Sequence, residues 1–235
     1  MDYPELEKYI GAHFPGYEGD IGAHFKKMLD IYITPGCSLL EVGCGRQVFG
    51  SEYYSRAAKK AGIDLEAEAI KENETLDSVV CGSIEHMSFP DNSFDIVIAQ
   101  WVLEHVADAA KTAKEVARVL KPGGVFLFMT PNTWSPFVIG TRFVPISLKK
   151  SLRKCFLSIA ETDTFPTHYR MNTIGTLNKL FASVHMKPEI TKLVDCFTYF
   201  KFSKTLVWLS VLGARVMNTL HITVFRHHLV GVYKK

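Results

Sequence analysis

Strand-like and helix-like segments alternate through the middle of this chain, and this alternation limits the possible folds more than any other feature. Apolar runs typical of buried strands occur at residues 37–42, 61–65, 77–83, 94–100 and 125–130. Helical patterns lie between them at residues 51–61, 66–73 and 106–120. Strands that are apolar on both faces and alternate with helices form a parallel sheet covered on both sides. We therefore predict an α/β fold with a doubly wound sheet.

The segments on either side of this centre follow a different pattern. Residues 20–32 have helical spacing, after a shorter helix that opens near Pro4, and residues 174–184 form a helix capped by Asn172 or Thr173. Two further strands are expected at 188–195 and 227–235. We divide the chain into an N-terminal helical cap (1–35), a core (36–133), and a substrate-side insert with the final helix and strands of the same domain (134–235).

Charge is distributed unevenly along the 235 residues. Residues 1–141 carry 12 Lys and Arg against 20 Asp and Glu, whereas residues 142–235 carry 15 against 4. The two parts are therefore expected to meet different partners. Five cysteines without a C-x-x-C pair indicate reduced thiols rather than disulfides or a zinc site. The acidic N-terminus does not resemble a secretory signal, so we expect a cytoplasmic protein.

One short stretch, "LLEVGCGRQVFG", joins an apolar strand to a turn of small residues. Glycines at Gly43 and Gly45 let the backbone approach a ligand closely, and Asp64 follows at the end of the next strand. A carboxylate in that place can accept both ribose hydroxyls of a nucleoside. The other interpretation is a tight strand-to-helix turn with a capping Asp. Gln47, where a dinucleotide loop has its third glycine, argues against a dinucleotide.

Several ordered motifs together resemble one family. Glu41 with Gly43 and Gly45, the acid Asp64, "SFPDNSFDIVIAQWVLEHVAD" and "VARVLKPGGVFLFMTPN" are similar to the class I S-adenosylmethionine-dependent methyltransferases, over about residues 36–133. The resemblance implies a Rossmann-like, seven-stranded, mostly parallel sheet with an antiparallel last strand. It also implies S-adenosyl-L-methionine as cofactor and S-adenosyl-L-homocysteine as product.

The resemblance implies a role for individual residues. Glu41 would hold the methionine amino group, Asp64 the ribose hydroxyls, Ser83 and Ile84 would border adenine, and Gln100 and Trp101 would lie near the sulfonium. The complete predicted cofactor set is Glu41, Gly43, Cys44, Gly45, Arg46, Asp64, Leu65, Ser83, Ile84, Gln100 and Trp101. Two positions depart from the family: Ser83 stands where relatives often have Asp, and Gln47 where they have Gly.

Two histidines are candidates for the base that removes a proton from a hydroxyl acceptor. His105 follows the strand 94–100, where active sites of the family open, and His168 lies in "DTFPTHYRMNT" beside the expected acceptor-binding residues Tyr169 and Arg170. Each histidine has a structural alternative, as a helix-start or loop residue. Glu104 and His105 resemble a metal-binding pair of quinone-forming relatives, which have an acid where this chain has Trp101, so we predict no metal.

The leading function is O-methylation of a small-molecule, glycan or lipid-linked acceptor. Residues 163–173 are similar to a stretch of methyltransferases encoded among bacterial glycan and glycolipid enzymes. The alternatives are C-methylation of a quinone-like ring and a catalytically silent methyltransferase-like binding protein. Nucleic acid is disfavoured, because the chain has neither an N-P-P-Y-like tetrapeptide nor an RNA-binding module. The sequence does not identify the acceptor. We expect the chain to be a monomer or a homodimer.

Residues 206–214, "LVWLSVLGA", are apolar on all sides and too short to span a bilayer. They are either a buried or dimer-forming helix or an interfacial helix on a membrane. A basic cluster of Lys149, Lys150, Arg153 and Lys154 would favour contact with an anionic membrane.

Overall fold

The computed structural model describes residues 2–14, 17–143, 165–200 and 202–235. The predicted basic cluster between residues 149 and 154 lies outside these ranges. The helices are α1 (Tyr3–His13), α2 (Ile21–Tyr32), α3 (Ala67–Lys71), α4 (Ala109–Val119), α5 (Pro136–Phe143), α7 (Ile174–Ala182) and α8 (Lys204–Thr219), with short 3-10 turns η1 (Ser51–Arg56), η2 (Leu103–His105), η3 (Thr198–Phe200) and η4 (Thr223–Phe225).

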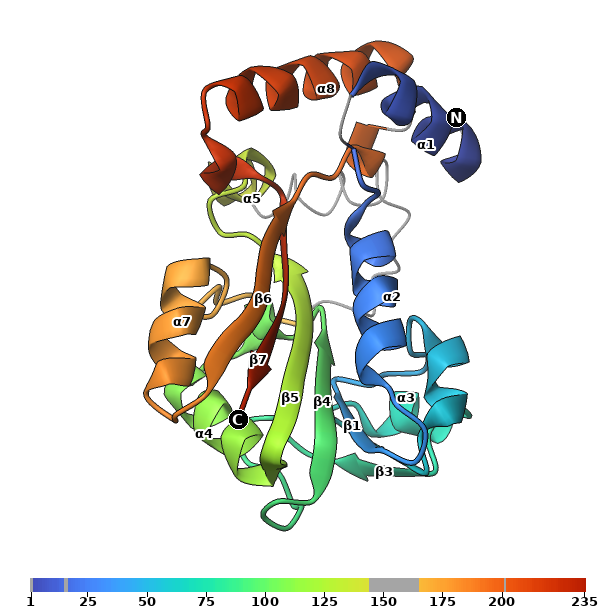
Figure 1. The fold of residues 1–235 in the computed structure, drawn as a ribbon, viewed down its shortest axis with the longest axis vertical. Helices are drawn as coiled ribbons and strands as arrows, with labels where there is room; N and C mark the ends of the chain where they lie inside the picture. The colour runs from blue at the N-terminus through green and yellow to red at the C-terminus, as the bar shows by residue number, and fades with distance from the viewer. Residues whose placement is uncertain (1, 15–16, 144–164, 201) are drawn as a thin grey trace. The chain divides into compact units, whose positions relative to one another are not determined.

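Seven strands form one sheet in the order β3-β2-β1-β4-β5-β7-β6. They are β1 (Ser38–Val42), β2 (Lys59–Asp64), β3 (Ser78–Cys81), β4 (Phe94–Gln100), β5 (Leu120–Pro131), β6 (Lys187–Val194) and β7 (His228–Lys234). The pairs β1–β2, β1–β4, β2–β3 and β4–β5 are parallel, whereas the β7 arrow runs opposite to those of β4 and β5 (Figure 1). Helices flank this sheet. The predicted fold class, including the antiparallel last strand, is confirmed.

The order of the strands reverses between β1 and β4. From β1 the chain moves to β2 and β3 on one side, and then returns to place β4 and β5 on the other. In open α/β sheets a crevice forms at such a switch point, outside the carboxyl ends of the strands. The end of β1 at Val42 and the end of β4 at Gln100 therefore mark the first place to look for a site.

Two predicted boundaries were wrong. The helix predicted over residues 51–61 is the six-residue turn η1, because Ala57 is extended and Lys59 already pairs with Ser38 of β1. The helix predicted over residues 106–120 spans Ala109–Val119, since Asp108 is its extended N-cap and Leu120 is extended and belongs to β5. Lys121 lies in β5. Its Nζ donates to Asp95 Oδ2 at 2.8 Å.

Aromatic rings join α7 to the sheet. Phe181 of α7 lies 5.2 Å from Phe126 and 4.5 Å from Tyr233, measured between ring centroids. All three side chains are fully buried. Burial of a ring of this size contributes roughly 1.5 to 3 kcal/mol, so this stack is a major part of what holds α7 and β7 in place.

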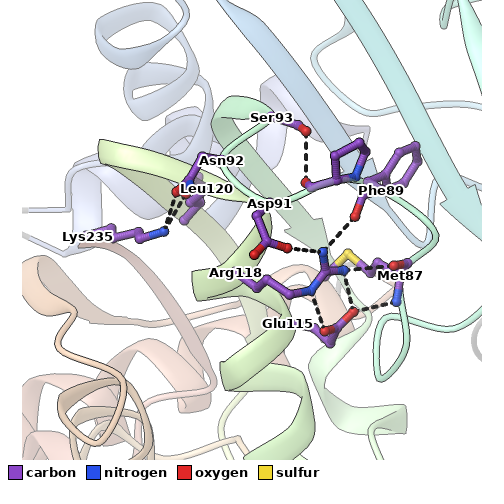
Figure 2. Close-up of polar contacts among 10 residues, drawn as sticks. Met87, Phe89, Asp91, Asn92, Ser93, Glu115, Arg118, Leu120 and Lys235 are labelled. Atoms are coloured by element: carbon purple, nitrogen blue, oxygen red, sulfur yellow. Dashed lines mark hydrogen bonds and ion pairs between the residues drawn. The ribbon is translucent and has the colours of Figure 1, made fainter.

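The loop before β4 is held by one arginine (Figure 2). Arg118 of α4 donates to the main-chain oxygens of Met87 (2.8 Å) and Phe89 (2.7 Å), and to the carboxylates of Asp91 (2.8 Å) and Glu115 (2.8 Å). The "PDNSFD" motif begins at this clamp, which precedes β4 and so lies at the opposite end of that strand from the switch point. Its role in the structure is therefore to position the loop and β4.

The chain divides into two compact units. The first contains described residues of 1–24, 131–166 and 193–228, and the second contains 25–130, 167–192 and 229–235. In the first unit, Leu6, Ile10 and Phe14 of the N-terminal segment pack with Phe197, Val207 and Val211. The predicted division at residues 35 and 133 is not tested by these units, each of which is discontinuous in sequence, and it stays a prediction.

Candidate functional site

The turn after β1 has the open backbone that the sequence predicts. Gly43 (φ 67°) and Gly45 (φ 46°) both adopt left-handed conformations, which side chains disfavour. A Cβ at Gly43 would overlap the Val102 side chain, whereas nothing lies within 4 Å of a Cβ placed at Gly45. The turn therefore packs closely on the β4 side and leaves the backbone at Gly45 accessible to a ligand.

Asp64 lies beside this turn at the end of β2. Its Oδ2 accepts the Gly45 N–H at 2.8 Å, and its Oδ1 accepts the Glu66 N–H at 2.9 Å. Each carboxylate oxygen has further lone-pair capacity, so the side chain can hold the turn and still accept hydroxyl donors. Leu65, which follows, has a 61% exposed side chain.

Asn73 stabilises the same turn by hydrogen bonds to its main chain. Its Nδ2 donates to the main-chain oxygens of Gly45 at 3.0 Å and Cys44 at 3.3 Å. This residue was not predicted as part of the site, because a single Asn in a polar stretch carries no periodic signal. Cys44 itself is buried, and burial raises the pKa of its thiol to about 12, so it packs as a small apolar side chain.

Glu41 is 1% exposed and carries a carboxyl group held by two side chains. The Tyr54 hydroxyl donates to Oε2, and Gln100 Nε2 donates to Oε1 at 3.0 Å and to the Phe49 main-chain oxygen at 3.2 Å. Burial raises the pKa of Glu41 to about 8, against the smaller opposite effect of these two hydrogen bonds. Among the described residues, the buried Oε1 of Gln100 has no hydrogen-bond partner.

The remaining predicted cofactor residues lie on three loops of the second unit. Arg46 is exposed and forms an ion pair with Glu72 at 3.3 Å. The Ser83 hydroxyl accepts the Glu85 N–H at 3.1 Å, and Ile84 is buried. Trp101 has a left-handed backbone (φ 59°) and a 38% exposed side chain.

A buried polar chain links the end of β4 to the segment that carries His168. Thr130 Oγ1 donates to the Glu104 carboxylate at 2.9 Å, and Asn172 Nδ2 donates to Thr130 Oγ1 at 2.6 Å. The main-chain oxygen of Glu104 accepts the N–H groups of His168 (2.7 Å) and Tyr169 (3.1 Å). Burial raises the pKa of the Glu104 carboxyl.

These hydrogen bonds bring the two candidate bases, His105 and His168, to one region. His105 follows Glu104 directly on η2, and His168 is hydrogen-bonded to Glu104 through its backbone. His168 and Arg170 are exposed, while His105 and Tyr169 are half-buried. Neither Thr130 nor Asn172 was predicted as a site residue, since only the fold brings them together; Asn172 was expected only as a possible helix cap. Within the described residues there is no group of three or more His, Cys, Asp or Glu able to hold a metal.

Comparison with known proteins agrees with this geometry. Residues 40–128, which run from β1 to β5 and contain the turn, Asp64 and the end of β4, match the family described as "Methyltransferase domain". The chain carries a class I S-adenosylmethionine-dependent methyltransferase domain.

Curated relatives of the methyltransferase domain share its core. The ubiquinone biosynthesis O-methyltransferase of Sodalis glossinidius (strain morsitans) is 31% identical over 121 residues, which cover 46% of this chain and 49% of that protein. The malonyl-[acyl-carrier protein] O-methyltransferase of Serratia marcescens is 26% identical over 149 residues, which cover 62% and 58%. The chain thus spans about half the length of the curated relatives it matches.

A solved structure shows the same fold. The S-adenosylmethionine-dependent methyltransferase from Mesorhizobium loti superposes with a TM-score of 0.58 at 17% identity, covering 89% of this chain and 96% of that chain. At this level of identity the similarity concerns the fold alone.

The residues present fit S-adenosylmethionine, the cofactor of this methyltransferase family. The accessible backbone at Gly45 lies beside the Asp64 carboxylate, and the buried Oε1 of Gln100 is an acceptor without a partner in the described part of the chain. An unpaired buried acceptor is costly. An ammonium group bound at the end of β4 would satisfy it.

Proposed function

We propose that this protein transfers a methyl group from S-adenosyl-L-methionine to a hydroxyl oxygen of a small-molecule, glycan or lipid-linked acceptor. The observation that carries the proposal is the Gly43–Gly45 turn closed by Asp64 at the switch point of the sheet. Two relatives of the methyltransferase domain are named as O-methyltransferases. The similarity of residues 163–173 to a stretch of methyltransferases encoded among bacterial glycan and glycolipid enzymes supports a sugar or lipid-linked acceptor.

The chain's own residues would bind the cofactor, orient the acceptor and remove the proton from its hydroxyl group. When bound, S-adenosylmethionine supplies an electrophilic methyl group on a sulfonium. Asp64 would accept the ribose hydroxyls, and Glu41 and Gln100 would provide acceptors for the methionine ammonium. The backbone link to Glu104 would place Tyr169 and Arg170 against the acceptor, so that alignment supplies much of the rate. His105, or else His168, would take the hydroxyl proton as the methyl group moves.

Two alternatives remain to be tested against this function. Methylation of a quinone-like ring carbon would need a base that acts on a ring carbon or ring hydroxyl, and a silent binding protein would lack transfer altogether. Cytoplasmic location and a monomeric or homodimeric state also stay predictions. A fractionation experiment and sedimentation of the purified chain would test them.

Calorimetry with S-adenosylmethionine is the first test, followed by a screen for labelled methyl transfer to lipid and glycan extracts. Asp64→Ala should weaken cofactor binding at least tenfold, because a charge-assisted bond contributes about 1.5 to 3 kcal/mol. Glu68→Ala is the matched control, since the Glu68 side chain is exposed on the neighbouring helix α3. Equal affinity of the two variants would remove the ribose assignment.

The product distinguishes the alternatives. An O-methyl ether is expected by mass spectrometry. A ring C-methyl product would support the quinone alternative, and a folded protein that binds no cofactor would support the silent one.

A further inference from the structure

Helix α8 presents two opposite apolar sides. Val207 and Val211 are buried against the α1 segment, at 0% and 2% exposure. The other large apolar side chains of the helix and the residue after it are exposed, and we call them the α8 apolar face: Leu206, Trp208, Leu209, Leu212, Val216, Met217 and Leu220.

The exposed residues form a continuous stripe. Leu209, Leu212, Val216 and Leu220 follow the three- and four-residue spacing of one helical face. Leu209 is 49% exposed, Val216 51% and Leu220 60%. Large apolar side chains grouped on one surface of a protein mark an interaction site more often than scattered ones do.

The charges on and around α8 indicate which kind of surface the α8 apolar face binds. Lys204 and Arg215 are about three helical turns apart, and so lie on the same edge of the helix. No Asp or Glu follows Asp195 in the sequence, whereas six Lys and Arg do. A stretch of this kind is complementary to an anionic surface. It offers a second copy of the same helix no acidic partner for its cations.

The composition matches a helix that lies in a bilayer interface. Such helices have Trp and Leu on one side and Lys or Arg beside them, and tryptophan prefers the headgroup level. Among the described helices, none is long and apolar enough to cross a membrane. The α8 apolar face could therefore lie along a bilayer and not through it.

We propose that α8 is a docking helix for the surface of an anionic phospholipid bilayer. The apolar face would enter the boundary between headgroups and acyl chains, and Lys204 and Arg215 would contact the anionic headgroups. Membrane docking is independent of methyl transfer. It would also give the enzyme access to a lipid-linked acceptor.

Sedimentation of the full chain with vesicles tests the docking. Vesicles of phosphatidylcholine with about 30% phosphatidylglycerol should retain the protein at about 0.1 M salt and release most of it at about 1 M, where the charges are screened. Pure phosphatidylcholine vesicles should bind it at least several-fold less. Wild-type protein that stays in the supernatant at low salt would overturn the proposal.

Variants separate docking from folding and from self-association. Leu209→Asp with Leu212→Asp should lower vesicle affinity at least tenfold, and Lys204→Glu with Arg215→Glu should lower it on anionic vesicles in particular. Ile31→Asp is the matched control, because Ile31 is 62% exposed on α2 and should leave binding unchanged.

Thermal unfolding must show that each variant folds. If Leu209→Asp with Leu212→Asp converts a dimer into a monomer and leaves vesicle binding unaltered, the α8 apolar face is a dimer contact and the docking proposal is wrong. A blue shift of the Trp208 emission on vesicles, lost in Trp208→Phe, would support insertion of the helix. An unshifted emission would overturn it.

Discussion

At the scale of single residues, the acids of the proposed site also have structural roles. Asp64 holds the turn by accepting the Gly45 N–H. Glu41 accepts hydrogen bonds from Tyr54 and Gln100, and its pKa is raised. A buried carboxyl group without a cationic partner favours its protonated form. The proposed binding of an ammonium group would reverse this preference.

Glu41→Gln should change how stability depends on pH. The pKa of Glu41 rises from 4.5 in the unfolded chain to about 8 in the fold, so its favourable contribution is complete below the lower value and is lost as pH rises through the upper one. The amide does not titrate. Between about pH 5 and pH 9 the variant should therefore gain on the order of a few kcal/mol relative to the wild type.

Urea unfolding at a series of pH values measures this difference. Glu68→Gln, at an exposed carboxylate, should show no comparable trend. A difference between Glu41→Gln and wild type that is the same at both ends of the range would contradict a raised pKa.

His105→Ala should lower turnover by roughly a hundredfold or more, because a positioned base contributes about 10² to 10⁴ in rate. Its affinity for S-adenosylmethionine should change little, since the proposed role concerns the acceptor. Initial rates and calorimetry on the same preparation give both quantities. If His105→Ala retains its turnover and His168→Ala does not, the base is His168.

At the scale of elements, strands and helices are positioned by polar side chains that bridge distant segments. Thr130, at the end of β5, accepts a hydrogen bond from Asn172 before α7 and donates one to Glu104 after β4. Arg118 connects α4 to the loop before β4. The first link lies beside the candidate bases and the second at the other end of β4, so they are expected to affect acceptor alignment and stability respectively.

Arg118→Met should destabilise the fold by about 2 to 4 kcal/mol, because it removes charge-assisted bonds to two carbonyls and two carboxylates. Lys111→Met is the control on the same helix. Within the described part of the chain its ion pair is an exposed contact of 3.8 Å with Asp108, and the substitution should cost less than about 0.5 kcal/mol. Equal midpoints in urea unfolding for the two variants would show that the clamp adds nothing to stability.

At the scale of the whole molecule, the predicted site residues all belong to the second compact unit, whereas α1 and α8 belong to the first. A ligand that binds a folded unit lowers the population of its open forms. The proposed cofactor site and the proposed membrane helix should therefore respond separately to their ligands.

Hydrogen exchange with S-adenosyl-L-homocysteine tests this separation. At about 100 times the dissociation constant, exchange around residues 43–45, 64–66 and 100–105 should slow by up to about a hundredfold. Exchange in α1 and α8 should not change. Protection confined to α1 and α8 would place the ligand elsewhere and contradict the proposed site.

Sequence alone determined the parts of the structure that depend on local pattern. The apolar runs at 37–42 and 94–100 became β1 and β4, and the glycines after β1 adopt the left-handed conformations that a close backbone turn requires. Strand periodicity and turn chemistry are encoded by neighbouring residues, so they are visible without the fold. The end of the helix at Val119 was missed, because pairing with β4 overrides a helical pattern that continues to Leu120.

Only the tertiary structure decided which distant side chains meet. No local pattern connects Tyr54 with Glu41, Asn73 with Gly45, or Asn172 with Thr130. The same holds for α8, for which the sequence permitted either a buried or an interfacial helix. Packing against α1 buries Val207 and Val211 and leaves Leu209 and Val216 exposed. Which side of an apolar helix is covered depends on the neighbour that the fold supplies, and an apolar sequence by itself does not specify that neighbour.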